Sequence, residues 1–247
     1  MLGLLMANAT ASEAYVTSGR WGTPTAVYYV NPKNNDVSEA AAIEGVRAAA
    51  DAWSLQSRAS FAFVYGGTTT TTAVGLDDKS TFLFRNEDAG NTLGVTYYWS
   101  TNGYFIESDI ILYDGGVRFF TGSSGCSSGF YVEDVGTHEF GHALGLGHSS
   151  VGDATMVSGQ GACTTWKRTL AEDDISGVEY LYPPSTTTST PPRAPTGVKV
   201  IASMLDSRGP VGPLLSRLGG GLPDEAAAAE PRHRTTAPDD NRAHRTI

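Results

Sequence analysis

The eleven residues HEFGHALGLGH, His138 to His148, constrain the fold of this chain more than any other segment. On an α-helix, His138 and His142 stand four residues apart, so their imidazoles project from one face and can meet at one point. Gly145 is a typical helix end, because glycine accepts the left-handed conformation that turns a chain sharply. We therefore expect a helix, a glycine stop and a return loop that brings His148 back to the first two histidines.

Three histidines gathered in this way indicate a metal site with one open position. Three neutral imidazoles leave the fourth tetrahedral position of a zinc ion to water, as in catalytic sites. Glu139 lies roughly 100° further around the helix than His138, where a carboxylate can act as a base without binding the metal. A closed structural site would need a fourth protein ligand, and none stands at a suitable spacing. Short HExxH strings occur by chance in surface helices, but this extended string fixes five positions.

A methionine, Met156, follows the histidine motif in the string DATMVSG, and the two features together resemble the metzincin clan of metallopeptidases. Ser149, directly after the third histidine, resembles the matrixins, the matrix-metalloproteinase family of that clan. Residues 170–184, with the pair Asp173 and Asp174, are similar to the closing helix of matrixin domains. The resemblance implies that Met156 forms a hydrophobic turn beneath the zinc and is no ligand. An ordinary core methionine is the alternative, and physically it is almost the same statement.

Aromatic and β-branched segments before the motif predict a sheet and a first helix. Asp36 and Glu39 form a candidate capping box for that helix. The zinc helix is expected over about residues 131–144. The order of these elements gives an α+β class, and the resemblance, over residues 15–183, implies a twisted, mostly parallel sheet packed on two long helices plus a C-terminal helix. The expected strands lie within residues 18–32 and at 61–65, 81–85, 93–99 and 105–113.

The sequence departs from vertebrate matrixins before the motif. Those proteins hold a second, structural zinc with histidines that precede the active-site helix, whereas no histidine precedes His138 here. The resemblance therefore implies one catalytic zinc. Vertebrate matrixins also carry an inhibitory propeptide with a zinc-blocking cysteine, and we expect no such cysteine here, because the only cysteines of this sequence are Cys126 and Cys163. The chain resembles the short, prokaryotic type of matrixin.

Cys126 and Cys163 flank the zinc helix and its return loop, with 36 residues between them. They form either a disulfide or two free thiols. We favour the disulfide, because exported proteins use cysteine sparingly and in even numbers. Closing a loop of this size stabilises a fold by roughly 3 to 4 kcal/mol in the chain-entropy model.

Charge divides the chain near residue 183. Residues 1–183 carry 9 basic and 20 acidic side chains, which argues against nucleic acid or anionic membranes as partners. The acidic residues Glu107, Asp109 and Asp114 are either calcium ligands, which matrixins commonly have near their strands, or solvated loop carboxylates. No stretch approaches the roughly 20 apolar residues of a membrane span. We expect a monomer whose partners are protein or peptide substrates.

The two ends of the sequence differ from the central part. Residues 1–14 resemble a remnant signal peptide, the alternative being a leader without structure. Residues 184–193 are a Ser/Thr/Pro linker of the kind that tethers extracellular modules. Residues 194–247 contain no aromatic side chain and predict a disordered tail, whose first eight residues resemble the start of a truncated fibronectin type III domain. These features predict a secreted protein.

The resulting hypothesis is a secreted zinc-dependent endopeptidase in which Glu139 activates the attacking water. By resemblance, residues 93–96 form the sheet edge on which an extended peptide pairs antiparallel, and residues 157–167 wall the specificity pocket. The alternative is a catalytically silent extracellular binding module that keeps the fold. Glu139 argues against that alternative, because a binder gains nothing from a base beside the metal.

Overall fold

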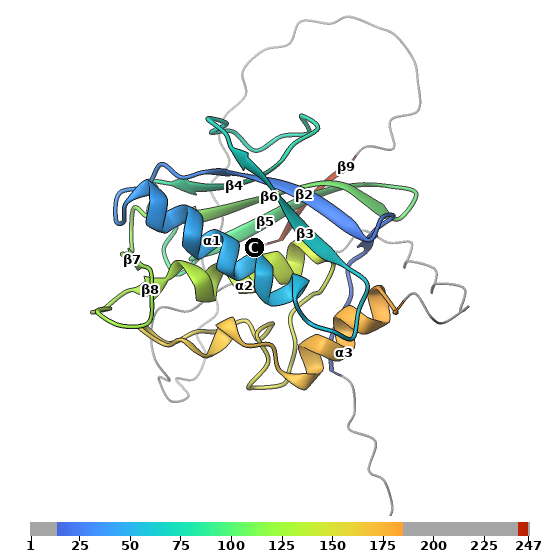
Figure 1. The fold of residues 1–247 in the computed structure, drawn as a ribbon. Coiled ribbons are helices and arrows are strands. Elements are labelled where there is room, and N and C mark those ends of the chain that lie inside the picture. The colour runs from blue at the N-terminus through green and yellow to red at the C-terminus, as the bar shows by residue number, and fades with distance from the viewer. Residues whose placement is uncertain (1–13, 185–241, 247) are drawn as a thin grey trace, which may run out of the picture.

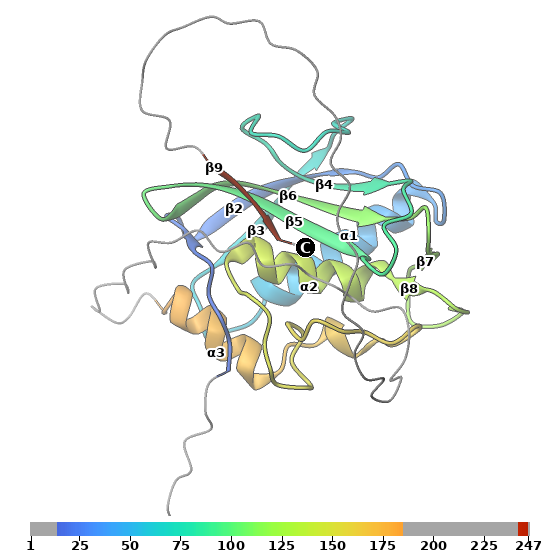
Figure 2. The same ribbon diagram turned by 180° about the vertical axis from the view of Figure 1, so that it is seen from behind.

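The computed structural model describes residues 14–184 and 242–246 of the chain (Figure 1). One twisted sheet carries helices on one side, with α1 and α2 against the sheet and α3 beyond them, as both views show (Figures 1 and 2). The helices are α1 (Glu39–Ser54), α2 (Val132–Leu144), the short 3-10 helix η1 (Trp166–Arg168) and α3 (Glu172–Leu181). The strands are β1 (Arg20–Trp21), β2 (Thr25–Asn31), β3 (Ala62–Thr68), β4 (Ser80–Arg85), β5 (Gly94–Thr101), β6 (Tyr104–Tyr113), β7 (Phe119–Phe120), β8 (Phe130–Tyr131) and β9 (Arg242–Thr246).

The main sheet has the strand order β3-β2-β4-β6-β5-β9, with β1 paired to β6. Neighbours from β3 to β6 run parallel, and β5 is antiparallel to β6. The predicted α+β fold with a mostly parallel sheet is therefore confirmed. Parallel strands need long crossovers, and α1 provides the crossover between β2 and β3. This arrangement leaves β5 next to α2, where the histidine motif lies.

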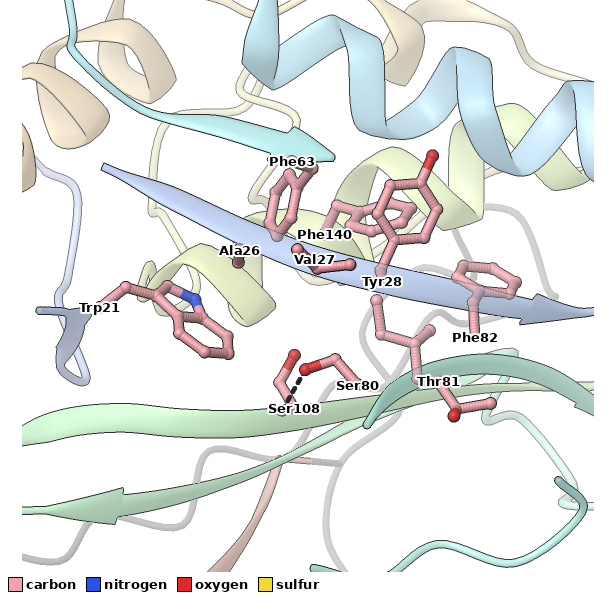
Figure 3. Close-up of a pocket in the computed structure, with 11 residues that line it drawn as sticks. Trp21, Ala26, Val27, Tyr28, Phe63, Ser80, Thr81, Phe82, Ser108 and Phe140 are labelled. Atoms are coloured by element: carbon pink, nitrogen blue, oxygen red, sulfur yellow. Dashed lines mark hydrogen bonds between the residues drawn. The ribbon is translucent and has the colours of Figure 1, made fainter. Parts of the chain in front are cut away.

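A single large core fills the space between the sheet and the helices. Trp53 of α1, Phe82 of β4 and Phe140 of α2 are at most 1% exposed there. A small internal space, seen in Figure 3, lies between β2, β4 and α2, and Phe140, Tyr28 and Phe82 contribute to its lining. None of the three motif histidines lines it. We conclude that it belongs to the core.

Helix α1 begins at Ser38 and not at Asp36. The Ser38 hydroxyl accepts the backbone N–H of Ala41, which is the bond of an N-terminal cap. The Asp36 carboxylate accepts the backbone N–H of Phe119 instead. The predicted Asp36–Glu39 capping box was therefore wrong, because a distant loop takes the Asp36 carboxylate and the nearer serine caps the helix.

Helix α2 is buried along its whole length, so it is the central helix of the domain. Its end at Gly145 has a φ of 122°, which residues with a side chain rarely adopt. A Cβ atom at Gly145 would also collide with the carbonyl of Gly19. The predicted glycine stop is confirmed, and it turns the chain toward His148.

Strand β9 pairs antiparallel with β5, so that Thr246 lies opposite Thr96 and Arg242 opposite Ser100. The sequence predicted no regular element within residues 194–247, and the difference has a simple cause. An edge strand presents unpaired N–H and C=O groups that pair with any extended backbone, whatever its side chains.

The linker at 184–193, the fibronectin-like start and the leader at 1–14 lie outside the described residues, save for positions 14 and 184. No described helix has the length and apolar character needed to cross a membrane.

Candidate metal centre

The three motif histidines meet in the structure. His138 and His142 project from one face of α2, and the loop after Gly145 returns His148 to them. One ring nitrogen from each lies within 4.8 Å of the others. The Nε2 atoms of His138 and His142 are 3.2 Å apart. Two nitrogens bound to a tetrahedral zinc at about 2.0–2.1 Å would be roughly 3.3 Å apart, so the spacing matches a shared zinc ion.

Hydrogen bonds fix the orientation of the first two rings. Nδ1 of His138 lies 2.8 Å from the carbonyl of Thr155, and Nδ1 of His142 lies 2.8 Å from the carbonyl of Leu146. A carbonyl only accepts, so each Nδ1 carries the proton and each Nε2 presents a lone pair. His148 Nε2 is buried and has no hydrogen-bond partner within the described part of the chain. Lone pairs that face one another without protons repel, and a cation between them removes that repulsion.

Burial keeps these histidines neutral. Loss of solvation lowers the pKa of His142 to about 3 and that of His148 to about 4, and it holds the pKa of His138 well below its usual value. The nearby ammonium of Lys167 acts in the same direction on all three. A neutral imidazole is the form that binds a metal, so all three rings are in that form at physiological pH.

Glu139 lies beside the histidines, fully buried, between α2 and β5. Its Oε2 accepts a hydrogen bond of 2.8 Å from the hydroxyl of Thr96. The sequence placed Thr96 on the expected sheet edge but did not predict its hydrogen bond to Glu139. A threonine at a buried strand position was the available signal, but which face of β5 meets α2 emerges only from the fold.

Met156 packs against α2 on the side away from Glu139, and its side chain is only 1% exposed. A side chain at Gly141 would collide with its sulfur, so the glycine lets the methionine approach the helix backbone closely. The Met156 carbonyl accepts the N–H of Ser149, 2.9 Å away, which ties the turn to the return loop. That Met156 forms a hydrophobic floor beneath a bound zinc stays a prediction.

Asp173 and Asp174, at the start of α3, hold the return loop from two sides. Asp174 is fully buried and accepts the backbone N–H groups of Thr155 and Met156 at 2.7 and 3.0 Å. Asp173 accepts the hydroxyl of Ser149 at 2.6 Å. The closing helix thus positions the loop that carries the third histidine.

The comparison with known proteins decides the family. A family model described as Matrixin matches residues 20–183, more than half of the chain. The chain belongs to the matrixin family. This confirms the resemblance that the motif, Ser149 and the closing helix indicated.

Relatives of this matrixin include animal and plant proteins. Matrilysin of Rattus norvegicus is 28% identical over 178 residues, which are 67% of this chain and 59% of the rat protein. Matrix metalloproteinase-20 of Homo sapiens is 26% identical over 197 residues, 76% of this chain and 38% of the human protein. Metalloendoproteinase 5-MMP of Arabidopsis thaliana is 52% identical over 54 residues, 21% of this chain and 14% of the plant protein. The matrixin thus spans less than two thirds of the length of these relatives.

Cys126 and Cys163 of this matrixin form a disulfide. The backbone N–H of Cys163 also donates to the carbonyl of Gly129, 2.8 Å away. The bond therefore joins the segment before α2 to the loop after Met156, as the favoured prediction had it.

The acidic residues Glu107 and Asp109 lie on β6 and are each 1% exposed, so they are not solvated loop carboxylates. Glu107 accepts the backbone N–H groups of Asp77 and Lys79, and Asp109 accepts those of Gly75 and Thr81. Asp114, 6% exposed, accepts the N–H of Asn35. The first two carboxylates hold the loop before β4 on the sheet. Calcium binding by Glu107 and Asp109 stays a prediction.

Lys167, expected only as the end of the segment that walls the specificity pocket, is a second residue whose contacts the sequence did not predict. It is fully buried, and its ammonium donates to the carbonyl of Val157 and lies 3.3 Å from His138 Nδ1. Because Nδ1 already carries a proton, this second contact is a close approach and not a hydrogen bond. Burial lowers the pKa of Lys167 to about 7, although Glu139, Asp174 and Asp134 oppose the shift. Lys167 lies in the short helix η1, and nothing in the sequence around it indicates that its side chain is buried.

Proposed function

We propose that this matrixin is a secreted zinc-dependent endopeptidase, with zinc held by His138, His142 and His148 and with Glu139 as the catalytic base. One observation carries the proposal. Two buried imidazoles and one partly buried imidazole, all neutral, converge so that one ring nitrogen of each lies within 4.8 Å of the others, and a buried carboxylate follows the first of them on the same helix. A binding module with the same fold would have no use for that carboxylate.

The chemistry is hydrolysis of a peptide bond. Zinc, when bound, polarises the scissile carbonyl and lowers the pKa of the attacking water. Glu139 accepts a proton from that water as it attacks, and then passes the proton to the amine that departs. One carboxylate thus serves first as base and then as acid, and Glu139 is ionised again at the end of the reaction.

The edge of β5 supports peptide binding. Strand β9 pairs with this edge in antiparallel register, so the edge can accept an extended chain there. Strand β5 begins at Gly94, whose backbone lies against Glu139. We propose that a substrate pairs with β5 in this way, which brings its scissile bond to the histidines. The loop from Val157 to Lys167 would line the neighbouring pocket.

Secretion is part of the proposal and has two supports. The disulfide needs an oxidising compartment to persist, and residues 1–14 resemble a signal peptide. Expression of the full chain, followed by comparison of medium and cell fractions on a blot, tests it. Protein confined to the reducing interior would contradict it.

The decisive experiment compares the purified full chain with Glu139→Gln, using casein or gelatin as substrate and metal analysis of both proteins. We expect the parent to lose activity with a chelator and recover it with zinc. The variant should bind zinc equally and lose nearly all turnover. Glu133→Gln, the same change on α2 at a residue that accepts the N–H of Gly122, should keep most of the activity. A parent that binds zinc but cleaves nothing would favour the binding module.

A further inference from the structure

The hydroxyl of Thr96 connects the sheet to the catalytic helix. Thr96 is fully buried in β5, and its Oγ1 lies 2.8 Å from Glu139 Oε2 and 3.0 Å from the Glu139 carbonyl oxygen. Successive side chains of a strand point to opposite faces, so Gly94 and Thr96 face α2 while Val95 packs on the other side. Val95 indeed belongs to the cluster with Leu83 and Ile111 on that far side.

A hydroxyl has one proton, so Thr96 can donate to only one of these two oxygens at a time. An ionised carboxylate is the stronger acceptor, and the hydrogen bond is then charge-assisted. A glutamate side chain otherwise has three rotatable bonds. The donor from β5 restricts them, since it holds Oε2 on the sheet side of the helix.

Gly94 leaves room for this carboxylate, because it has no side chain. A Cβ atom at Gly94 would lie 2.8 Å from Glu139 Oε1 and 2.9 Å from its Cγ. The missing side chain therefore leaves the space that the carboxylate occupies. With Gly94 beneath and Thr96 bonded to one oxygen, β5 determines both the place and the direction of the Glu139 carboxylate.

We propose that Thr96 is a positioning residue for the catalytic base: its hydroxyl holds Oε2 of Glu139, so that Oε1 takes the proton of the attacking water. The inference rests on the proposed function, because Glu139 must be the base. In the proton transfer, the water O–H bond breaks and an O–H bond forms at Oε1. The Thr96 proton stays on its own oxygen throughout.

Thr96→Val tests the proposal, because valine keeps the shape and removes the donor. Loss of a hydrogen bond to a charged group that acts on the reaction itself should lower kcat about tenfold and leave KM within about twofold. Thr96→Ser restores the hydroxyl and should return kcat to near the parent value. Thr81→Val is the matched control, since Thr81 is a buried threonine on β4 that donates to the Lys79 carbonyl, and kcat should not change.

A second readout does not depend on turnover. Crystal structures of the metal-free parent and of Thr96→Val should show the Glu139 carboxylate moved or spread over several rotamers only in the variant. An unmoved carboxylate with unchanged kcat would overturn the proposal, and so would an equal loss in Thr96→Ser or Thr81→Val, which would indicate packing. A parent without zinc-dependent cleavage would refute the proposed function instead, while the two crystal structures would still decide whether Thr96 holds Glu139.

Discussion

Asp174 Oδ1 accepts the backbone N–H of Met156, 3.0 Å away, and its other oxygen accepts that of Thr155. The carbonyl of Thr155 in turn lies 2.8 Å from Nδ1 of His138. The closing helix is therefore connected to the first histidine through a single turn of backbone. The fold around the metal centre depends on a carboxylate that touches no histidine.

The substitution Asp174→Ala should lower the free energy of unfolding by about 3 kcal/mol, because it leaves buried N–H groups at Thr155 and Met156 without acceptors. The backbone N–H of Ala171, at the start of α3, also donates to Asp174 and would lose its acceptor as well. Urea unfolding followed by tryptophan fluorescence measures the change.

Asp173→Ala is the matched control for that measurement. Asp173 is partly exposed and accepts hydrogen bonds from the Ser149 hydroxyl and the N–H of Ala14. Water can partly replace Asp173 as the acceptor for these two groups. We expect a loss of about 1 kcal/mol or less. Equal losses of unfolding free energy in the two variants would show that the hydrogen bonds from Asp174 to the turn do not stabilise the fold more than those of Asp173.

Reduction of the Cys126–Cys163 disulfide should destabilise the matrixin domain by roughly 3 to 4 kcal/mol, because the unfolded chain regains the freedom of the loop. Urea unfolding with and without a reducing agent measures the difference. The variant with serine at both positions should match the reduced parent and be insensitive to the reducing agent. A reductant-induced shift in that variant would mean that another effect of the agent was being measured.

Asp109 predicts a pH dependence of stability. Burial raises its pKa to about 7 from the ordinary 3.8, against the hydrogen bonds from Gly75 and Thr81, which lower it. Between these two values the unfolded chain releases the proton and the folded chain keeps it. The free energy of unfolding therefore falls as pH rises from about 4 to 7, by roughly 2 to 4 kcal/mol from this residue, and levels off above pH 7.

Asp109→Asn removes that titration and tests the sign. Its stability should vary less between pH 4 and 7 than that of the parent, although its level is lower because an amide N–H then faces a backbone donor. Denaturant unfolding at several pH values gives both curves. Parallel curves would contradict the prediction. The same measurements with added calcium test the calcium prediction, which requires stabilisation of the parent beyond that of the variant.

We expect β9 to compete with a peptide substrate for the edge of β5. It pairs with β5 from Thr96 to Ser100, where we propose that a peptide pairs. His244→Pro removes a backbone N–H within β9 and should weaken the strand, so KM for a long peptide should fall while kcat stays the same. Thr235→Pro, outside β9, is the control and should leave KM unchanged. A KM that is the same in both variants would mean that β9 does not compete with the peptide.

The sequence alone determined the family, the α+β class and the histidine cluster. The family came from a resemblance carried by the motif, Met156, Ser149 and the closing helix. The other two follow from local rules: the spacing of His138 and His142 on a helix, a glycine that ends the helix, and segments rich in aromatic and β-branched residues. They require only the neighbouring residues along the chain. The pairing of Cys126 with Cys163 followed from composition in the same way, as a choice between two alternatives.

Tertiary structure decided what the polar side chains contact. Ser38 instead of Asp36 caps α1, because a distant loop recruits the aspartate. Glu107 and Asp109 are buried beneath a loop 30 residues earlier in the chain. Thr96 meets Glu139 across a gap of 43 residues. Hydrogen bonds of this kind depend on which elements lie side by side, and a residue's local sequence contains no record of a neighbour that only packing brings to it.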